Sequence, residues 1–475
     1  MKVPVLNLIL DGHMVSFKPD GSDLTPESRQ KSRVVTPVPL PTSAVVHHGR
    51  TATPEPTSEY FPATATGPHL AGHDIPTIPA AEVWWDASPL LTPNQNAAIV
   101  PAGVLSRGEP SRWPLKTEQE VMLMRCYKEQ LTRRFDHVDS TGCFSNQIPE
   151  LAAGSPVLLN TILAAAARHL QMLGELDEAV TLRYQAAAMD MLLPSFQQGL
   201  GDATDLTAAV LLRHTLMRVA TPDSVYMLNA LPGLGVYLAV WQNNPQSALH
   251  AALSIAMLRM SIFSCWVAGT IPAVEADCSW ITGCYYPGTT DFWNCKITML
   301  LARTINYCHD DASKKAEERW VVLDALAHDW AARKPKCFQP IFEQEPTGSE
   351  CFPRLEFAGN LHAMAFIYHS LTALLLASNR PSLSNFGDEN ATARYEMEQH
   401  SLYILRRVCG VALSHPGTCL CLATLALSHS GHLLHDMSSQ KAAHDILVQA
   451  QRHAVADAGR AVDNRLRATW AWCPS

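Results

Sequence analysis

The sequence predicts an all-α protein, in which a large irregular multi-helix domain over residues 116–475 follows a disordered Pro/Ser/Thr-rich arm over residues 1–115. Two observations lead to this prediction. The first is the uneven distribution of proline, since 17 of the 32 prolines fall in the first 115 residues and 15 in the remaining 360. The second is that apolar residues after the arm recur every three or four positions, and no stretch shows sustained strand alternation bounded by hairpin turns.

The arm has the periodicity of neither a helix nor a strand, as its segment "TPVPLPTSAVV" illustrates. Each proline removes a backbone donor and pushes the preceding residue toward extended conformations. Such a segment buries too little apolar surface to offset its ordering entropy, so we expect it to be disordered. One apolar stretch in the arm, "AAEVWWDASPLL" at residues 80–91, is interpreted either as a short recognition element or as an aromatic pair without such a role.

The first two predicted helices carry clear start and stop signals. Thr117 and Glu120 in "TEQE" have the form of a capping box. In "SPVLLNTILAAAARHLQMLG", Ser155 is the expected N-cap, Pro156 occupies the first turn and Gly174 closes the helix. The expected buried stripes are Met124, Tyr127, Leu131 and Phe135 in the first helix, and Leu159, Ile162, Leu163, Ala166, Leu170 and Leu173 in the second.

More helices are expected along the rest of the chain. Those at residues 177–194 and 205–222 are each opened by an aspartate and stopped by a proline. The G-x-G in "LPGLGVY", residues 231–237, is interpreted as a loop because no third glycine follows it. No period of 20 to 50 residues repeats, so a solenoid is not predicted. Further helices are predicted around residues 248–266, 292–308, 317–332, 361–377, 393–413, 420–435 and 440–455.

The charge of the chain argues against a protein that wraps nucleic acid with a broadly basic surface. The formal net charge is −8 and the pI is about 6.2. The best basic run, "SRQKSRVV" at residues 28–35, has three basic residues and no aromatic residue between them. No basic nucleic-acid patch is therefore predicted.

The chain is expected to be soluble and intracellular. Its 13 cysteines are odd in number and follow no repeat, and a chain of this length needs no disulfide staples, so we expect reduced, mostly buried thiols. The apolar stretches at residues 251–274 and 361–378 are interpreted as buried helices, because the first contains Arg259 and Pro272 and the second two histidines. The N-terminal "MKVPVLNLILDG" is short for the apolar region of a signal peptide. No membrane contact is expected.

Histidine is the first residue type to test for a metal site, because there are 20 of them. The segment "SHSGHLLHD" places His429, His432 and His435 at successive threes, with His444 and His453 beyond. Two histidines at i and i+3 on a helix could share a metal, but the third rotates off that face and no H-E-x-x-H occurs. These side chains are therefore interpreted as satisfied or surface histidines.

Other chemical motifs are equally weak. Cys419 and Cys421 form a C-x-C pair, but no C-x2-C occurs, so no zinc site is expected. No nucleophile elbow or phosphate-binding loop is present, and the carboxylate pairs at residues 310–311 and 317–318 are interpreted as solvated. The prediction is that the chain has no catalytic, cofactor-binding or metal-binding residue, no cofactor and no enzymatic activity. An enzyme remains the rival hypothesis, with the His429 stretch and Asp277 as the places to look. A loose cysteine group consists of Cys278, Cys284 and Cys295.

Six soft motifs follow one another in order over about 340 residues. They are "EVMLMRCYKEQL…FD", "IPELAAGSPVLLNTILAAAARHLQMLGELDEAVTLRYQAAAMDMLLP", "DFWNCKITMLLARTINYCHD", "ERWVVLDALAHDW", "FQPIFEQEPTGSECFPRLEFAGNLHAMAFIYHSLTALLLAS" and "RRVCGVALSHP". From about Thr117 onward the chain resembles the C-terminal regulatory domain of fungal zinc-cluster (Zn2Cys6) transcription factors, the fungal-specific transcription factor domain. This family domain has no catalytic residues to carry over.

The resemblance implies a nuclear transcriptional regulator of a metabolic or secondary-metabolite pathway. Relatives carry an upstream six-cysteine module that binds two zinc ions and reads DNA, whereas residues 1–115 contain no cysteine. Three interpretations stay open: a co-regulator without the zinc cluster, a sequence that lacks an upstream exon, or a domain used for another role. The expected partners are other transcription regulators or a DNA-binding partner, with a small-molecule effector as an option. The alternative function is a helical protein of a biosynthetic gene cluster with an enzymatic or small-molecule-binding role.

Overall fold

The helices predicted from the sequence dominate the part of the chain whose structure is described. The computed structural model describes residues 6–10, 13–17, 113–136, 142–199, 201–218, 222–233, 235–237, 248–268, 279–309, 317–348, 350–381, 388–453 and 456–472. The all-α prediction is confirmed, because the strands among these residues form only two short antiparallel hairpins. The chain divides into two compact units, Met1–Pro79 and Ala80–Ser475.

In the first unit the structure describes one hairpin. Strands β1 (Leu6–Leu10) and β2 (His13–Phe17) pair antiparallel, with β1 starting opposite the end of β2. No strand is predicted there from the sequence, and for these ten residues that prediction is wrong. The missed signal is "DG" between two apolar runs, which is typical of a two-residue hairpin turn. The other residues of the predicted arm up to residue 112, including the 80–91 stretch, lie outside the described residues.

The second unit opens with helices that pack around α5. The predicted capping box is confirmed, because the Thr117 hydroxyl accepts from the amide of Glu120 and the Glu120 carboxylate accepts from the amide of Thr117. The Ser155 hydroxyl accepts from the amide of Leu158 at 3.3 Å, which confirms the N-cap of α5. These elements are α2 (Glu118–Cys126), the π-helix η1 (Tyr127–Leu131), α3 (Thr132–Phe135), α4 (Gln147–Gly154), α5 (Pro156–Met172), α6 (Glu178–Gln198), α7 (Ala203–Leu216) and α8 (Pro222–Ala230).

Helix α4 of this group was not predicted from the sequence, and three further details differ from the prediction. Helix α6 continues through Pro194, which is exposed, so water can satisfy the carbonyl that its missing amide leaves free. Helix α7 is capped by Asp202 rather than opened by Asp205, and it ends before Pro222, which instead begins α8. Leu173, expected in the buried stripe of α5, is the C-cap residue and is 39% exposed.

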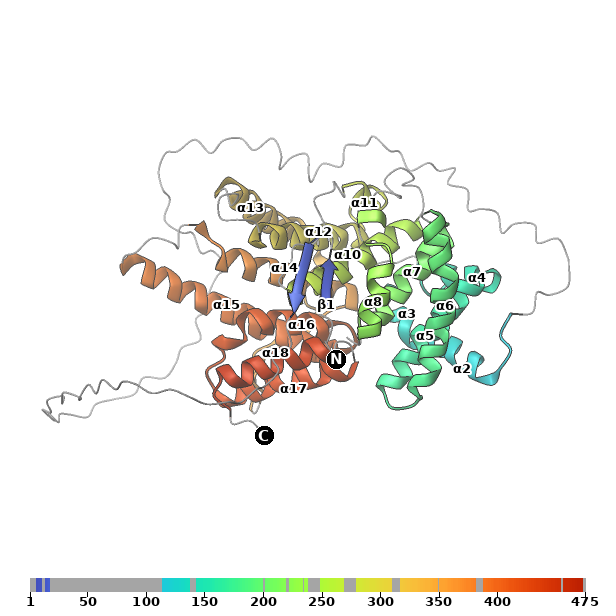
Figure 1. Cartoon of the computed structure of the whole chain (residues 1–475). Coiled ribbons are helices and arrows are strands. Elements are labelled where there is room, and N and C mark those ends of the chain that lie inside the picture. Colours follow the sequence, from blue (N-terminus) through green and yellow to red (C-terminus); the bar gives the residue numbers. More distant parts are fainter. Residues whose placement is uncertain are drawn as a thin grey trace, which may run out of the picture. The chain divides into compact units, whose positions relative to one another are not determined.

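The remaining helices agree with the predicted series and add two that were missed, α11 and α18 (Figure 1). The helix expected at residues 420–435 ends at residue 430 and continues as a short 3-10 turn. The elements are α10 (Ala248–Ala268), α11 (Ser279–Gly283), α12 (Thr290–His309), α13 (Glu317–Arg333), η4 (Lys336–Phe338), α14 (Asn360–Ser378), α15 (Asp388–Ser414), α16 (Pro416–Ser430), η6 (Gly431–Leu433), α17 (Met437–His453) and α18 (Ala456–Thr469).

Four of these helices form a closed ring. Helix α10 packs on α12, α12 on α14, α14 on α16, and α16 on α10. The last turns of all four line one cavity, so the four helices run in the same direction. Between them in the chain, α13 runs antiparallel to α12 and α14, since Trp330 contacts the first turn of α12 while Arg319 lies over Tyr307 near its end. The ring is the core of the C-terminal half, and its buried apolar residues join one cluster with those around α5.

The two most apolar helices belong to this ring. By length and composition alone, α10 and α14 could each cross a membrane, but more than half of each apolar window is buried inside the protein. Arg259, which interrupts the apolar run of α10, donates from Nε to the Tyr368 hydroxyl of α14 at 2.9 Å. In the described structure both helices pack as core helices.

A second hairpin lies between α13 and α14. Strands β3 (Phe342–Gln344) and β4 (Arg354–Glu356) pair antiparallel, and β4 packs against α15. No strand is predicted there, because three residues are too few to show alternation. His415, at the start of α16, secures this junction: its Nε2 accepts from the amide of Phe357 at 3.1 Å and its Nδ1 lies 3.1 Å from Asn360 Oδ1.

The N-cap of α5 offers a direct test of the local structure. We expect Ser155→Ala to lower the free energy of unfolding by about 1 kcal/mol, because the amide of Leu158 loses its hydroxyl acceptor. Ser155→Asp keeps an acceptor at the same position and should recover most of that loss. Chemical denaturation of the three proteins measures the difference. Equal stability of Ser155→Ala and the parent would show that solvent replaces the cap without cost.

Candidate functional site

The site with the most developed geometry is a cleft of about 640 Å³ between α13, α14 and α15. Helices α13 and α15 both pack on α14, which therefore forms the floor. The lining residues recur at three- and four-residue steps, so each helix turns one face into the cleft. They are Trp320, Asp324, Ala327, His328 and Ala331 from α13, Phe366, His369, Ser370, Ala373, Leu376, Ala377 and Arg380 from α14 and the residues after it, and Ala393, Glu396, Met397, His400, Tyr403, Ile404 and Arg407 from α15.

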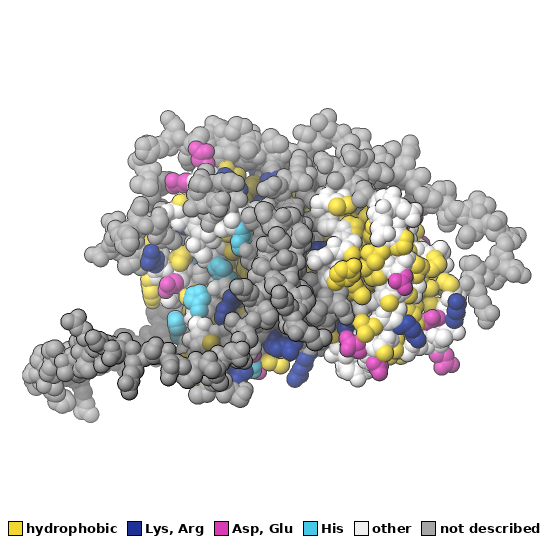
Figure 2. Space-filling view, viewed as in Figure 1, with side chains coloured by type: hydrophobic (Ala, Val, Ile, Leu, Met, Phe, Trp, Pro, Cys, Tyr) yellow, Lys and Arg dark blue, Asp and Glu magenta, His cyan; other side chains and the backbone are white. Residues whose placement is uncertain are grey.

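The cleft exists because the three helices meet through small side chains. Five of its lining residues are alanines, distributed over all three helices. An alanine fills less of the space between packed helices than the leucines that fill the neighbouring core. In Figure 1 the N-terminal half of α15 also extends away from the other helices. The apolar floor therefore stays open to one side, and the surface around α14 and α15 in Figure 2 mixes histidine, charged and hydrophobic side chains.

His369 lies in the middle of the floor. Its ring stacks on Trp330, with ring centroids 5.3 Å apart, and its Nε2 is 3.3 Å from the carbonyl oxygen of Ala327. Burial lowers the pKa of His369 to about 4, and the positive charge of Lys334 contributes to that decrease. The ring is therefore neutral near pH 7. If Nε2–H donates to Ala327, Nδ1 carries the lone pair.

The end of the cleft near Phe366 carries a neutralised cation. The Arg407 guanidinium lies 5.6 Å from the centroid of the Phe366 ring and 5.4 Å from that of Tyr403. It forms a two-pronged ion pair with Glu343 of β3, whose second contact joins Nη2 to Oε2 at 3.2 Å. Because its charge is matched, Arg407 closes this end of the cleft without leaving a free charge for a ligand.

The opposite end carries a cation without such a match. Trp320 of α13 donates from Nε1 to the carbonyl oxygen of Leu376 at 2.9 Å, which fixes its ring over the end of α14. The Arg380 guanidinium lies 5.8 Å from the centroid of that ring. Among the described residues, no carboxylate lies within 4 Å of Arg380. Glu396 lines the α15 side of the cleft and is exposed.

The chemistry of the lining favours binding. The Ser370 hydroxyl donates to the Phe366 carbonyl within α14. Asp324 and His328 line the α13 side of the cleft, where His328 Nδ1 lies 3.4 Å from Asp324 Oδ2. The described lining thus combines an apolar floor and a neutral histidine with an arginine at each end and with Asp324 and Glu396 on its sides. That combination is typical of a site that orients an amphipathic ligand.

A second cavity of about 550 Å³ lies where the four ring helices end, and α18 closes it. Trp266 donates from Nε1 to the Ser428 hydroxyl at 2.9 Å, and its ring meets His429 edge-on at 6.1 Å. Burial lowers the pKa of His429 to about 4, with a smaller contribution from His432. Arg465 of α18 donates to the carbonyl oxygen of Ser428 and so caps the end of α16.

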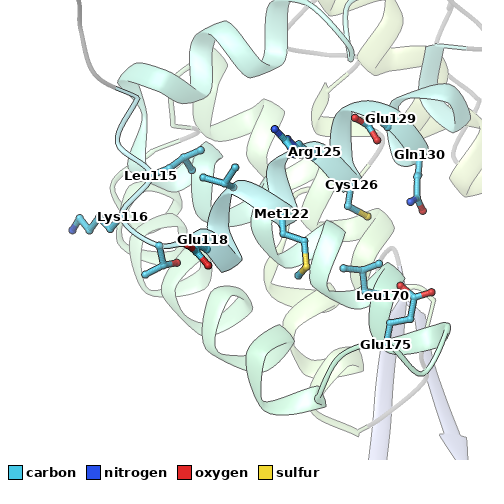
Figure 3. A pocket seen from close by; sticks show the side chains of 12 residues that line it. Leu115, Lys116, Glu118, Met122, Arg125, Cys126, Glu129, Gln130, Leu170 and Glu175 are labelled. Atoms are coloured by element: carbon cyan, nitrogen blue, oxygen red, sulfur yellow. The ribbon is translucent and has the colours of Figure 1, made fainter.

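A third cavity of about 620 Å³ is a depression beside α2 (Figure 3). Met122 of α2 and Leu170 of α5 lie on either side of it, and charged side chains of both signs surround them. Val121 and Met122 are more than 40% exposed, so much of this surface already faces water. It holds fewer oriented polar groups than the cleft between α13, α14 and α15.

The histidines that the sequence brings together lie on different elements of the structure. His429 is on α16, whereas His432 is on η6, and His432 and His435 are both exposed. His444 instead pairs with Asp463 of α18 at 2.6 Å between Nδ1 and Oδ1. Among the described residues, no group of three or more His, Cys, Asp or Glu is placed to hold a metal ion. The side chain of His453 lies outside the described residues.

Among the described residues, the cysteine candidates form no group that could hold a metal ion either. Cys419 is buried, and burial raises its pKa well above the usual value. Burial also raises the pKa of Cys284 to about 11, which leaves little reactive thiolate near neutral pH. No disulfide joins one described cysteine to another. Cys278, Asp277 and the pair at 310–311 lie outside the described residues, and the 317–318 pair occupies the first turn of α13.

The cleft residues were not singled out from the sequence. Trp320, His369 and Arg380 are spread over 60 residues, and no short motif contains them all. The available signal was local: His369 interrupts an apolar run, and Arg380 lies three residues after the end of the same predicted helix. Only the packing of α13 on α14 shows that Trp320 lies beneath Arg380.

Comparison with known proteins does not place the chain in a family. No family model, no curated protein and no solved structure matches it.

Proposed function

We propose that this chain is a transcriptional regulator of a metabolic or secondary-metabolite pathway in a fungus, and that it works in the nucleus. Residues 116–475 act as its regulatory domain. The observation that carries the proposal is the order of the six motifs that resemble the regulatory domain of zinc-cluster transcription factors. Recognition of DNA is left to a zinc module or a partner outside residues 1–475.

The positions of the motifs in the fold support this proposal. The motifs correspond to α2 with η1, to α4–α6, to α12, to α13, to the segment from η4 to α14, and to the end of α15. Segments far apart in the sequence pack together there: α12 contacts α13 and α14, and β4 contacts α15. The resemblance therefore lies in elements that form one packed interior, rather than in scattered surface loops.

A tethering experiment tests the proposal. The full chain is fused to a heterologous DNA-binding domain and expressed in a fungal host with a reporter that carries the matching operator. We expect reporter output to change at least fivefold relative to the DNA-binding domain alone, and a fluorescent fusion of the untethered chain to accumulate in the nucleus. A stable nuclear fusion that leaves the reporter unchanged, at both an active and a silent promoter, would contradict the proposal.

A second function is favoured by the cleft itself. A protein that binds a small molecule but does not regulate transcription would need the same apolar floor and the same arginine, Arg380, over the Trp320 ring. The two functions differ in the tethering result, because such a protein stays inert at the reporter while still binding its ligand.

A further inference from the structure

We propose that the cleft between α13, α14 and α15 binds a long-chain monocarboxylic acid, with its carboxylate on Arg380 and its hydrocarbon chain along α14 toward Phe366. This inference rests on the proposed function, because it takes the cleft as the effector site of the regulator. It names the ligand class that the charges and dimensions of the cleft would recognise.

The floor matches a hydrocarbon chain. Between Phe366 and Arg380 it is formed by Ala373, Leu376 and Ala377 together with His369, whose pKa is lowered so that it stays uncharged. These groups offer apolar contact along the cleft without a free charge in the middle of the floor. The volume of about 640 Å³ lies within the usual range for small-molecule sites.

The length of the cleft sets the length of the chain. Phe366 and Arg380 are about four helical turns apart, which corresponds to roughly 21 Å along the axis. At about 1.3 Å of advance per tetrahedral C–C bond, that distance takes an extended acid of roughly 16 carbons. The Arg407 end is closed, because its guanidinium is occupied by Glu343 and lies over Phe366.

The charge pattern selects a carboxylate over a neutral head group. Arg380 is held over the Trp320 ring at the open end of the floor, with no described carboxylate within 4 Å. Helices α13 and α15 both begin at this end and α14 ends there. Glu317 and Glu318 in the first turn of α13 offset the positive end of that helix. Glu396 on the α15 side opposes an anion, and its removal should strengthen binding.

The test measures binding to the purified full-length chain through the fluorescence of its tryptophans, one of which lines the cleft. The probes are palmitic acid and hexadecanol, which share a chain and differ in charge. We expect palmitic acid to bind at least tenfold more tightly than hexadecanol. Arg380→Gln should weaken the binding of palmitic acid about tenfold, because it removes a charge-assisted contact. It should leave the binding of hexadecanol unchanged. Glu396→Gln should strengthen the binding of palmitic acid and leave that of hexadecanol unchanged.

Two further variants complete the design. Arg394→Gln removes an exposed arginine of α15 that does not line the cleft, and it should change neither affinity. Ala373→Trp fills the floor of the cleft and should abolish the binding of both probes. A circular dichroism spectrum that matches that of the parent shows that the variant is folded. Equal affinities for acid and alcohol, no effect of Arg380→Gln, or no binding of either probe would each overturn the inference. If the chain binds palmitic acid but does not change the reporter when it is tethered to DNA, the proposed function is contradicted and the proposed ligand class is supported.

Discussion

Replacing Gly410 with alanine should lower the free energy of unfolding by about 2 kcal/mol, even though alanine is the better helix former. Gly410 is buried in α15, under the residue that precedes β4. A Cβ at this position would lie 1.9 Å from the carbonyl oxygen of Pro353 and 3.3 Å from Leu355 Cδ1. A backbone oxygen cannot rotate away as a side chain can, so the hairpin or the helix must move.

The expected magnitude follows from two opposing effects. Overpacking of a buried site costs about 1–3 kcal/mol and sometimes more. Replacing glycine with alanine inside a helix raises the free energy of unfolding by only about 1 kcal/mol. Because the contact at Gly410 is far inside van der Waals distance and involves backbone, the cost should win.

Chemical denaturation of Gly410→Ala against the parent measures this effect. Gly417→Ala is the matched control, because Gly417 lies in the first turn of α16 and a Cβ added there would meet no atom within 4 Å. That substitution should leave stability unchanged or raise it slightly. If Gly410→Ala were as stable as the parent, β4 would not approach α15 as closely as described.

Acid should destabilise the protein well above the pH at which carboxylates protonate. Burial lowers the pKa of both His369 and His429 from 6.5 to about 4, and it also lowers the pKa of His362 and His415. A histidine whose pKa is lower in the folded state is protonated first in the unfolded chain. Its contribution to stability is complete above pH 6.5 and is lost as the pH falls toward 4.

The slope of stability against pH is the measured quantity. Near pH 5 each of the two histidines should contribute roughly 1 kcal/mol per pH unit, so that together they remove several kcal/mol between pH 7 and pH 4. Chemical denaturation at pH 7.0, 6.0, 5.0 and 4.5 follows it. This pH window excludes the titration of Asp436. Because the pKa of Asp436 is about 2, the contribution of its carboxylate to stability is lost only in stronger acid.

Substitutions show which residues cause the slope of stability against pH. His369→Gln and His429→Gln should each reduce the slope by the contribution of one histidine, whatever their effect on stability at pH 7. Ser155→Ala should lower stability equally at every pH and leave the slope unchanged, because it removes only a neutral cap. A parent protein whose stability is flat from pH 7 to pH 5 would show that these rings are not held neutral by burial.

The helices could be predicted because their signals are local. Ser155, Pro156 and Gly174 mark both ends of α5 within its own sequence, and the caps and the left-handed turn at Gly174 are found as expected. Where a local signal failed, the surroundings overrode it. Pro194 did not stop α6, because the helix remains packed on α5 and the proline faces solvent.

The candidate site could not be predicted in the same way. The cleft depends on Trp320 from one helix, Arg380 after a second and Arg407 on a third, and their spacing in the sequence carries no periodic signal. The histidine series that the sequence emphasised is divided by the end of α16 at residue 430. The pKa of His369 depends on burial against Trp330, which lies 39 residues away in the chain.

The sequence alone therefore determined the all-α class, the positions of most helices after residue 116 and the order of the motifs, because capping and periodicity act within a few residues. Only the tertiary structure decided which helices adjoin. It closed α10, α12, α14 and α16 into a ring, left alanine faces of α13, α14 and α15 to form a cleft, and placed one arginine there without a described carboxylate partner. Such features arise from contacts between residues distant in the chain, which no local pattern encodes.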